Sequence, residues 1–469
     1  MFAWCLAELR KKAALSEAIG LVPVFDATTA VVKSDNAISM EVKEELKKGV
    51  SILEDVQEHA KDWHPGSDGK VLDLVHPSLC PLVYDSVKAC GTGQIIPVPE
   101  KKPAESRSTQ GLWSYKFQWL PCEVDIQDGE PAITSYTNNF HPQHHAGLYV
   151  TIEKIIKKAL PLWDVIYRWH IDFEVLRICS NEARRECKAG CTDYCTQENR
   201  PFDPGEDERN EDEYRRSSLN YQRDKAWFDR IHPVKRPNAP NYSPMLLQPN
   251  DVNLERGFLD GTDRIQPTYD GGSRHIEDQL NEHICATAFY YYDNDNVTES
   301  RLAFRTNANK DDHMIELDYA QNDIDSIERT FKIKGRGNIT QELGSVLTRE
   351  DRLLAFPNHC VAPFELIDKT KPGYRKILAL FLVDPTVPII STANVPPQQR
   401  DWWKEGLIPN GRFGPLPAEV TDMGFDDLDF PISLERAKNI REELMAERTA
   451  TPRCNSSDRR MDTWSSSGH

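Results

Sequence analysis

Two histidines and one glutamate in the second half of the chain have the residue types and the spacing of an iron site. His275 and Glu277 lie two residues apart in the run RHIED, residues 274–278. In an extended segment, residues two apart project from the same face with Cα atoms about 6–7 Å apart, so both side chains reach one cation. His359 follows at the end of a later predicted strand. Two histidines and one carboxylate form the facial triad of non-haem Fe(II) sites, so the sequence predicts a metal site.

Arg375 is the fourth residue of this set. It lies 16 residues after His359, in the predicted strand 374–383 (YRKILALFLV), where apolar residues occupy both faces. A guanidinium in a buried strand needs an anion, and its fork geometry fits a carboxylate. The carboxylate of a bound 2-oxo acid is the natural partner. The order His-x-Glu, His, Arg is similar to that of the Fe(II) and 2-oxoglutarate-dependent oxygenases, in which Arg375 would bind 2-oxoglutarate.

The elements that must position these residues are short strands. Segments 284–292, 301–306, 345–356 and 374–383 are rich in β-branched and aromatic residues and are separated by Gly, Pro, Asn and Asp. No helical pattern lies between them, which favours a sandwich or jelly roll over a βαβ sheet. We expect an α+β protein with a double-stranded β-helix core, jelly-roll and cupin-like, with helical N-terminal and C-terminal elaborations.

Helical patterns flank this core. Residues 40–56 place apolar side chains every three or four positions, which predicts one amphipathic helix. Residues 148–170 do the same, but Pro161 interrupts them and predicts two packed helical pieces. Residues 434–448 predict a surface helix with Ser433 as its N-cap.

These patterns divide the chain into six regions. We expect a helical and loop region at 1–102, and a helical region at 113–180 that packs on the core. A charged mobile insertion at 181–240 includes the acidic run 205–216. The jelly-roll core at 241–400 is followed by a C-terminal helical extension at 401–448 and a disordered tail at 449–469.

Composition limits the partners. The chain has 469 residues, with 57 Lys and Arg against 74 Asp and Glu, and its net charge of −17 argues against nonspecific nucleic-acid binding. The longest apolar run, 377–383, is far too short to span a membrane. Charges at 8–12 argue against a signal peptide, and eleven cysteines, an odd number, suit reduced thiols. We expect a cytoplasmic protein that binds a small-molecule substrate and neither nucleic acid nor membrane.

Rival clusters have more ordinary interpretations. Cys187, Cys191 and Cys195 would share one stripe of a helix, but they lack the paired short spacing of zinc sites, so free thiols are favoured. The histidines of HPQHHAG, residues 141–147, and Trp63 and His64 of KDWHPGSDGK, residues 61–70, are interpreted as loop residues. His283 is expected to support the site or the fold. The tyrosines at 290–292 alternate across a strand, so one face is core and the other faces a pocket.

Long blocks of the sequence resemble one fungal family, catalogued as domain of unknown function 4246. These blocks are KDWHPGSDGKVLDLVHPSL, TSYTNNFHPQHHAGLY, YDGGSRHIEDQLNEHICATAFYYYD, QELGSVLTREDRLLAFPN, PFELIDKTKPGYRKILALFLVDP and ISTANVPPQQRDWW. The resemblance implies an oxygenase-like jelly roll and an iron site with an uncharacterised substrate. Residue by residue, it places His275 and Glu277 at the family's His-x-Glu, His359 at its distal histidine and Arg375 at its basic residue.

The sequence departs from the family pattern around this site. Arg274 and Asp278 replace a tryptophan and a glycine, the segment after Asn358 is short, and a core strand before Gly271 is missing. Three functions therefore stay open. One is an Fe(II) and 2-oxoglutarate-dependent oxygenase that hydroxylates or desaturates a small molecule, impaired by the missing strand. Another is a catalytically inactive jelly-roll interaction or regulatory protein, and a zinc hydrolase is a third alternative.

Overall fold

The computed structural model describes most of the chain outside 168–278 and 308–339. The described residues are 2–26, 30–99, 113–167, 279–307, 340–357, 370–407 and 430–459, with short pieces at 184–185, 234–235, 256–260, 263–265, 268–269, 364–365, 420, 423–425 and 428. The predicted insertion at 181–240 lies outside them except for β9 (Arg184–Arg185) and β10 (Val234–Lys235). Cys187, Cys191 and Cys195 also lie outside them.

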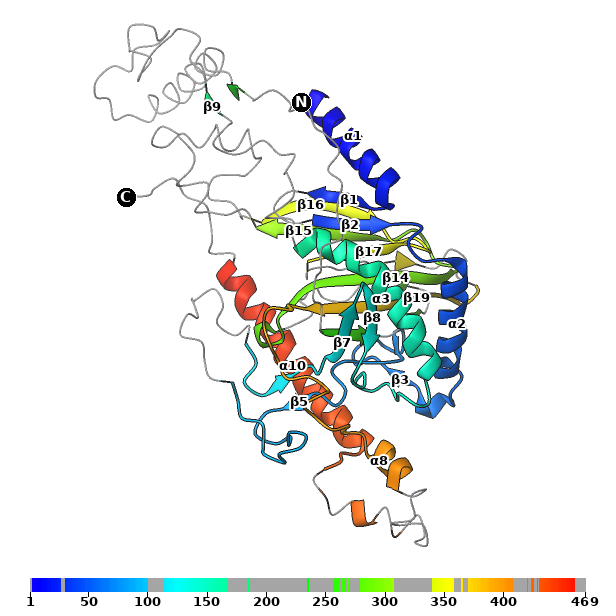
Figure 1. The fold of residues 1–469 in the computed structure, drawn as a ribbon, viewed down its shortest axis with the longest axis vertical. Coiled ribbons are helices and arrows are strands. Elements are labelled where there is room, and N and C mark those ends of the chain that lie inside the picture. The colour runs from blue at the N-terminus through cyan, green and yellow to red at the C-terminus, as the bar shows by residue number, and fades with distance from the viewer. Residues whose placement is uncertain are drawn as a thin grey trace, which may run out of the picture.

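One antiparallel sheet of nine strands organises the molecule (Figure 1). β14 (Ile284–Asp295) and β19 (Gly373–Val383) are its long central strands, and they pair from Ile284 with Val383 to Asp295 with Tyr374. Outward from β14 lie β17 (Leu353–Phe356), β2 (Ala30–Ser34) and β1 (Val22–Asp26). Outward from β19 lie β11 (Arg256–Asp260), β7 (Cys122–Gln127) and β8 (Glu130–Ile133), while β12 (Asp263–Ile265) also pairs with β19.

The other described strands form antiparallel pairs. They are β15 (Arg301–Asn307) with β16 (Thr340–Leu347), β13 (Thr268–Tyr269) with β18 (Phe364–Glu365), β3 (Asp62–Trp63) with β4 (Leu72–Asp73), β5 (Leu82–Val83) with β6 (Phe117–Gln118), and β9 with β10. The α+β prediction is confirmed, but the described strands do not close into a barrel. The predicted strand segment 345–356 divides into β16 and β17, because a turn at Glu350 and Asp351 separates them.

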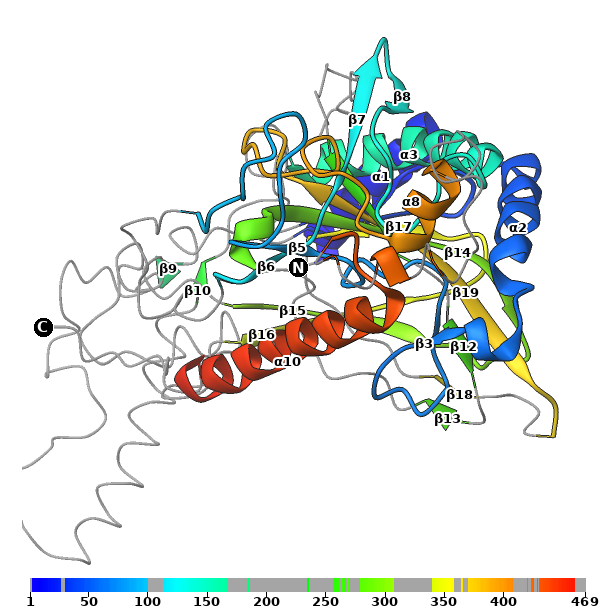
Figure 2. The same cartoon turned by 90° about the horizontal axis from the view of Figure 1, so that it is seen from below.

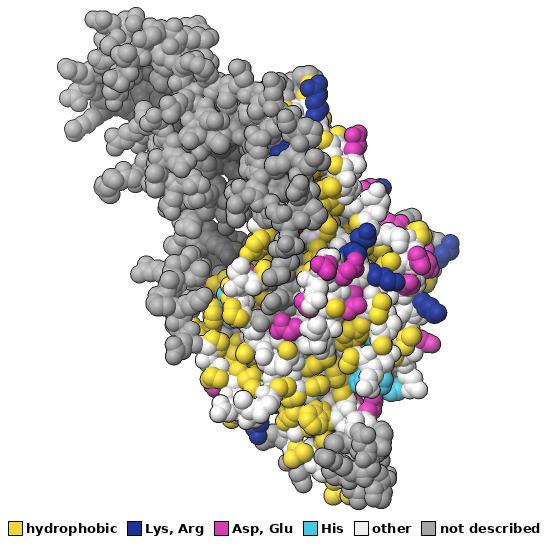
Figure 3. All heavy atoms as spheres, in the orientation of Figure 1, with side chains coloured by type: hydrophobic (Ala, Val, Ile, Leu, Met, Phe, Trp, Pro, Cys, Tyr) yellow, Lys and Arg dark blue, Asp and Glu magenta, His cyan; other side chains and the backbone are white. Residues whose placement is uncertain are grey.

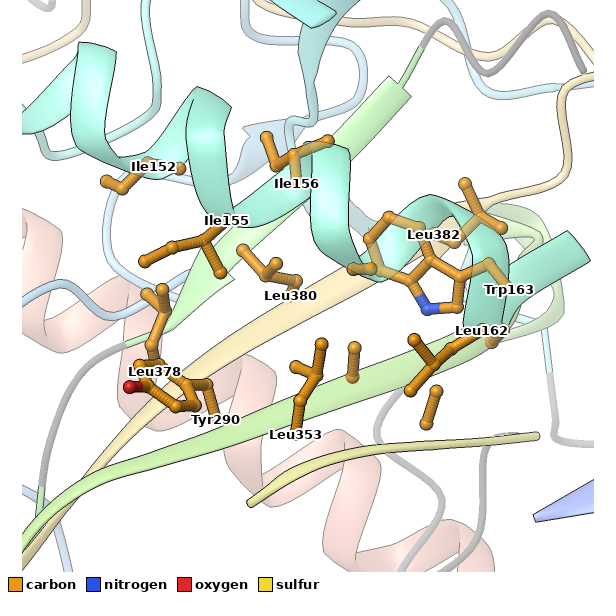
Figure 4. Close-up of a cluster of buried hydrophobic side chains, with 14 of the residues drawn as sticks. Ile152, Ile155, Ile156, Leu162, Trp163, Tyr290, Leu353, Leu378, Leu380 and Leu382 are labelled. Atoms are coloured by element: carbon orange, nitrogen blue, oxygen red, sulfur yellow. The ribbon is translucent and has the colours of Figure 1, made fainter. Parts of the chain in front are cut away.

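The central strands present two different faces because side chains alternate along a strand. Tyr290 and Tyr292 of β14 lie in the same buried cluster as α3 (Ala146–Tyr167), with the even-numbered leucines of β19. Figure 4 shows this packing of α3 on the sheet. Tyr291 lies in another cluster, with Phe304 of β15 and Phe356 of β17. The predicted alternation of the tyrosine run is confirmed, but both faces are buried, so Tyr291 packs in a second cluster where a pocket was expected.

Helix α3 is continuous, so the expected break at Pro161 does not occur. Pro161 lies inside the helix and is solvent-exposed. Ile155 and Ala159 before it, and Leu162 and Val165 after it, are all buried. Proline removes one backbone hydrogen bond, and burial of the apolar face on both sides of it holds the two turns in line.

The remaining helices cover the sheet from two sides. α2 (Met40–Glu54), as predicted, follows an N-cap in which Ser39 accepts a hydrogen bond from the Val42 amide, and it packs on α3. α1 (Phe2–Ile19) precedes β1. The described helical elements also include α8 (Arg400–Leu407), α10 and the single turns η1 (Glu58–Ala60) and η4 (Leu280–Glu282). α10 (Leu434–Arg459) begins after the predicted cap Ser433, whose Oγ accepts from the Arg436 amide, and it extends beyond the predicted end.

α10 and α3 lie on opposite sides of the sheet (Figure 2). Ile440 and Leu444 of α10 share a buried cluster with Ala379, Phe381 and Val383 of β19. Among the described residues, none of the helices combines the length and apolarity needed to cross a membrane. Positive and negative side chains are interspersed over α2 and α3 (Figure 3), where Lys154 pairs with Glu45 at 2.7 Å.

The packing of α3 gives a stability prediction. Leu162 is fully buried against the sheet, whereas Val150 on the same helix is 52% exposed. Leu162→Ala removes buried apolar atoms and leaves a cavity, so we expect the free energy of unfolding to fall by about 2–5 kcal/mol. Val150→Ala is the matched control, with an expected change within about 0.5 kcal/mol. Urea denaturation measures both, and equal effects would contradict the central role of this face.

Candidate functional site

Arg375 is buried on the sheet face that lies away from α3. It is 4% exposed and lies beside Tyr291, with the guanidinium carbon 5.7 Å from the centre of the ring. Its Nη1 donates to the Ser300 hydroxyl and, at 3.2 Å, to that of Thr348. Ser300 and Thr348 flank β15 and β16, and their hydroxyls are hydrogen-bonded to each other. The described partners of this guanidinium thus include hydroxyl groups of the kind that also bind carboxylates.

His275, Glu277 and His359 lie outside the described residues. The described ends of their segments lie close together. Thr287, near the start of β14, pairs with Phe356, the last residue of β17. Glu277 precedes the start of β14 by seven residues, and His359 follows Phe356 by three. The chain therefore enters both segments from one end of the β14–β17 pair.

The strand position expected to be missing is filled. β11 pairs with β19 from Gly257–Leu382 to Asp260–Ala379, and β12 continues with Asp263 opposite Arg375. β7 pairs in turn with β11. Because β19 has neighbours on both sides, the shortened sequence before Gly271 does not leave its edge open.

A second group of titratable side chains was not identified as a site from the sequence. His64 Nδ1 lies 3.0 Å from Asp73 Oδ2, and His76 Nε2 lies 3.6 Å from the same oxygen. The two imidazoles are stacked, with ring centres 5.1 Å apart. Burial raises the pKa of Asp73, although the hydrogen bond from His64 opposes this. The sequence signals were the segment KDWHPGSDGK, residues 61–70, interpreted as a loop, and the longer block to residue 79 that resembles the family.

These three residues have the spacing of a metal site, with their ligand atoms within 4.8 Å of one another. The protonation of His76 does not fit this role. The Ser78 amide donates to His76 Nδ1 at 3.0 Å, so in the neutral ring the proton is on Nε2, which faces Asp73. A protonated ring nitrogen cannot bind a metal ion. We conclude that this is a polar group in which His64 and Asp73 are hydrogen-bonded, while His76 Nε2 faces the same oxygen beyond hydrogen-bond distance.

A similar arrangement lies at the surface, in the HPQHH segment. His144 Nε2 lies 2.9 Å from Glu405 Oε2 of α8, and His141 Nε2 lies 3.8 Å from it. The amides of Gln143 and His144 both donate to His141 Nδ1, at 3.3 Å. His141, like His76, is followed by proline, and its Nδ1 accepts hydrogen bonds from backbone amides of the turn that it begins. Only His144 and Glu405, each half exposed, remain as suitable metal ligands, too few for a closed site.

The burial of His76 gives a pH prediction. Burial lowers the pKa of His76 well below its usual 6.5, so in this range the unfolded chain binds a proton that the folded protein does not. The free energy of unfolding therefore falls as the pH drops below 6.5, because protons bind to this histidine in the unfolded chain first. Above pH 6.5 the histidine is neutral in both states and has no such effect. The Asn carbonyl can still accept from the Ser78 amide, so in His76→Asn we expect a smaller loss of stability between pH 7 and pH 5.

Thermal and urea unfolding at several pH values test this expectation. The exposed His59→Asn is the matched control and should leave the slope of stability against pH unchanged. An unchanged slope in His76→Asn would show that His76 does not titrate in this way.

Comparison with known proteins identifies a family and no activity. The family described as Protein of unknown function (DUF4246) matches residues 1–406. The match runs from the N-terminus into α8 and includes Arg375 and the His64–His76 segment, whereas α10 lies beyond it. No curated protein and no solved structure matches the chain. Because the match covers most of its length, the chain belongs to this family of proteins of unknown function.

Proposed function

We propose that this protein is an Fe(II) and 2-oxoglutarate-dependent oxygenase that acts on a small molecule. The observation behind the proposal is the pairing order of the strands from β11 to β19 together with the buried Arg375. The paired strands and Arg375 are all among the described residues. The metal ligands in the proposal, His275, Glu277 and His359, come from the sequence.

The strands between 256 and 383 pair as one nested hairpin. β11 and β12 pair with β19, β13 with β18, β14 with β17, and β15 with β16. A jelly roll results when such a hairpin wraps so that successive pairs alternate between two sheets. The first and third pairs share the nine-stranded sheet, joined by β14 and β19, and the second and fourth lie outside it. This order supports a double-stranded β-helix core.

The surroundings of Arg375 support the proposed binding of 2-oxoglutarate. A 2-oxo dicarboxylate needs a cation and hydroxyl donors at the end that is remote from the metal. Arg375, Ser300 and Thr348 supply these groups in a buried setting, where charge-assisted hydrogen bonds are strong. The carboxylate would take over hydrogen bonds that the hydroxyls and the guanidinium now make with one another.

The spacing along β19 is compatible with a cofactor of this size. Phe381 pairs with Thr287, near the point where the segments of His275 and His359 begin. Arg375 lies six residues away along the same strand, roughly 20 Å at 3.3 Å per residue. An arginine side chain, a five-carbon dicarboxylate and a histidine side chain laid end to end span a distance of this order.

When bound, Fe(II) and 2-oxoglutarate would supply the oxidation of an unactivated C–H bond with dioxygen as the oxidant, and 2-oxoglutarate would be converted to succinate and carbon dioxide. The protein's own groups have other tasks. The two histidines and the glutamate would hold the metal and leave positions open, and Arg375 would orient the dicarboxylate. The apolar side chains of Phe289, Phe304 and Phe356 on this face would exclude water.

Succinate release tests the proposed activity. Purified protein with added Fe(II) and 2-oxoglutarate should release succinate, and His275→Ala should abolish this because it removes a metal ligand. Equal release by both proteins would contradict the proposal. No release by either protein, with no Fe(II) bound by the wild type, would instead favour the inactive interaction or regulatory protein.

The role of Arg375 gives a separate prediction. We expect Arg375→Lys to raise the KM for 2-oxoglutarate at least tenfold, because lysine cannot reproduce the planar fork. Arg352→Lys is the matched control. Arg352 is equally buried, but it pairs with Asp35 at 2.6 and 2.9 Å, so we expect its change to lower stability and not the affinity for 2-oxoglutarate. The same KM in both variants would exclude Arg375 as the binding group.

A further inference from the structure

Helix α10 is held on the sheet by two arginines that lie seven residues apart. Arg441 donates to both oxygens of Asp62 on β3, at 2.6 and 3.0 Å. Arg448 donates to Glu282 Oε1 at 2.6 Å. Residues seven apart lie on one face of a helix, so the same face of α10 brings both cations to the sheet. Arg441 is 3% exposed and Glu282 is fully buried, so the docking of α10 depends on the charges beneath it.

The first arginine meets the histidine group described above. Asp62 lies opposite Asp73 in the β3–β4 pair, and residues opposite each other in a pair share one face. Asp73 Oδ2 lies 3.0 Å from His64 Nδ1 and 3.6 Å from His76 Nε2. The two imidazoles are stacked on each other. Two carboxylates therefore separate the guanidinium of Arg441 from the two rings.

The second arginine meets the same histidine through a tryptophan. The guanidinium of Arg448 lies over the Trp119 ring, 4.0 Å from its centre. Trp119 Nε1 donates to the Ser78 hydroxyl at 2.9 Å, and the Ser78 amide donates to His76 Nδ1 at 3.0 Å. Ser78 is 1% exposed and His76 is 8% exposed. A chain of buried contacts thus joins the imidazole of His76 to α10.

A proton on His76 would disrupt this arrangement. The protonated ring has an N–H at both nitrogens, so the Ser78 amide would face a donor in place of an acceptor. The ring would also be a further cation in the layer that Arg441 and Arg448 enter. Burial and the positive charges of His64, Arg441 and Arg448 lower the pKa of His76. Both causes weaken when α10 leaves, because the arginines leave with it and water enters.

The buried carboxylates of this layer are less suited to sense acid. Burial raises the pKa of Glu282 and of Asp73, and the charges of Arg448 and Arg441, respectively, oppose that rise. Departure of α10 would remove the arginines and admit water, and these two changes move each carboxyl pKa in opposite directions. At His76 the two changes act in the same direction.

We propose that α10 is an acid-sensitive strap, which leaves the sheet when His76 takes up a proton. Its departure would expose an apolar face that includes Phe117, Trp119 and Phe381. One histidine that titrates near its usual value only in the released state weakens docking by up to about tenfold per pH unit. Between pH 7 and pH 5 this amounts to about 25-fold.

Hydrogen exchange of the full-length protein measures the docking equilibrium. The exchange rates of amides at 438–448, divided by the intrinsic rates at each pH, give the opening constant of α10. We expect this constant to rise about 25-fold from pH 7 to pH 5. At both pH values it should exceed the opening constant of α3 amides at 152–160, which report unfolding of the core. His76→Asn keeps an acceptor for the Ser78 amide and should limit the rise to about threefold.

Two further variants separate the proposed sensor from its surroundings. Glu282→Gln removes a second titratable group beneath α10, and His59→Asn removes an exposed histidine, so both should keep the full rise. A rise that persists in His76→Asn, or that disappears in Glu282→Gln, would overturn the role of His76. An opening constant of α10 that does not change with pH in the wild type would overturn the proposal without any variant. Equal opening constants for α10 and α3 at pH 5 would also overturn it, because the helix would then open only with the whole core.

Discussion

The antiparallel pairing of β14 with β19 is the constraint on which the rest of the structure depends. It runs nearly the full length of both strands and divides their side chains between two sides. One side packs on α3, and the other bears Tyr291 and Arg375. A shift of the register by one residue would move each side chain of the shifted strand to the opposite face of the sheet, so the apolar side chains would no longer pack on α3. The place of Arg375 is therefore fixed by the same ladder that fixes the core.

Buried arginines mark the points where distant parts of the chain are joined. Arg352 joins the start of β17 to Asp35 after β2, and Arg448 joins α10 to Glu282. Each of these two is matched with a carboxylate, as the cost of a buried charge requires. The described partners of Arg375 include the hydroxyls of Ser300 and Thr348. A guanidinium and hydroxyls together can bind a carboxylate, which supports the role proposed for Arg375.

The histidines also divide by their hydrogen bonds. His76 and His141 both accept a hydrogen bond at Nδ1 from a backbone amide of the turn that they begin. This fixes their protonation and suits them to packing and not to metal binding. A histidine that lies near other possible metal-binding side chains is thus not necessarily a metal ligand. The hydrogen bonds of each ring decide which of its nitrogens has a lone pair available.

The sequence by itself determined the local features: a helix within the predicted range 40–56, the Ser433 cap, and strands at the predicted segments 284–292 and 374–383. It also determined the family resemblance that the match to residues 1–406 confirms. These follow from side-chain periodicity and capping chemistry, which act over a few residues. Tertiary structure decided that α3 continues through Pro161, that β11 and β12 fill the edge of β19, and that Asp73 lies between His64 and His76. Those outcomes depend on contacts between segments far apart in the chain, whose energies no local pattern contains.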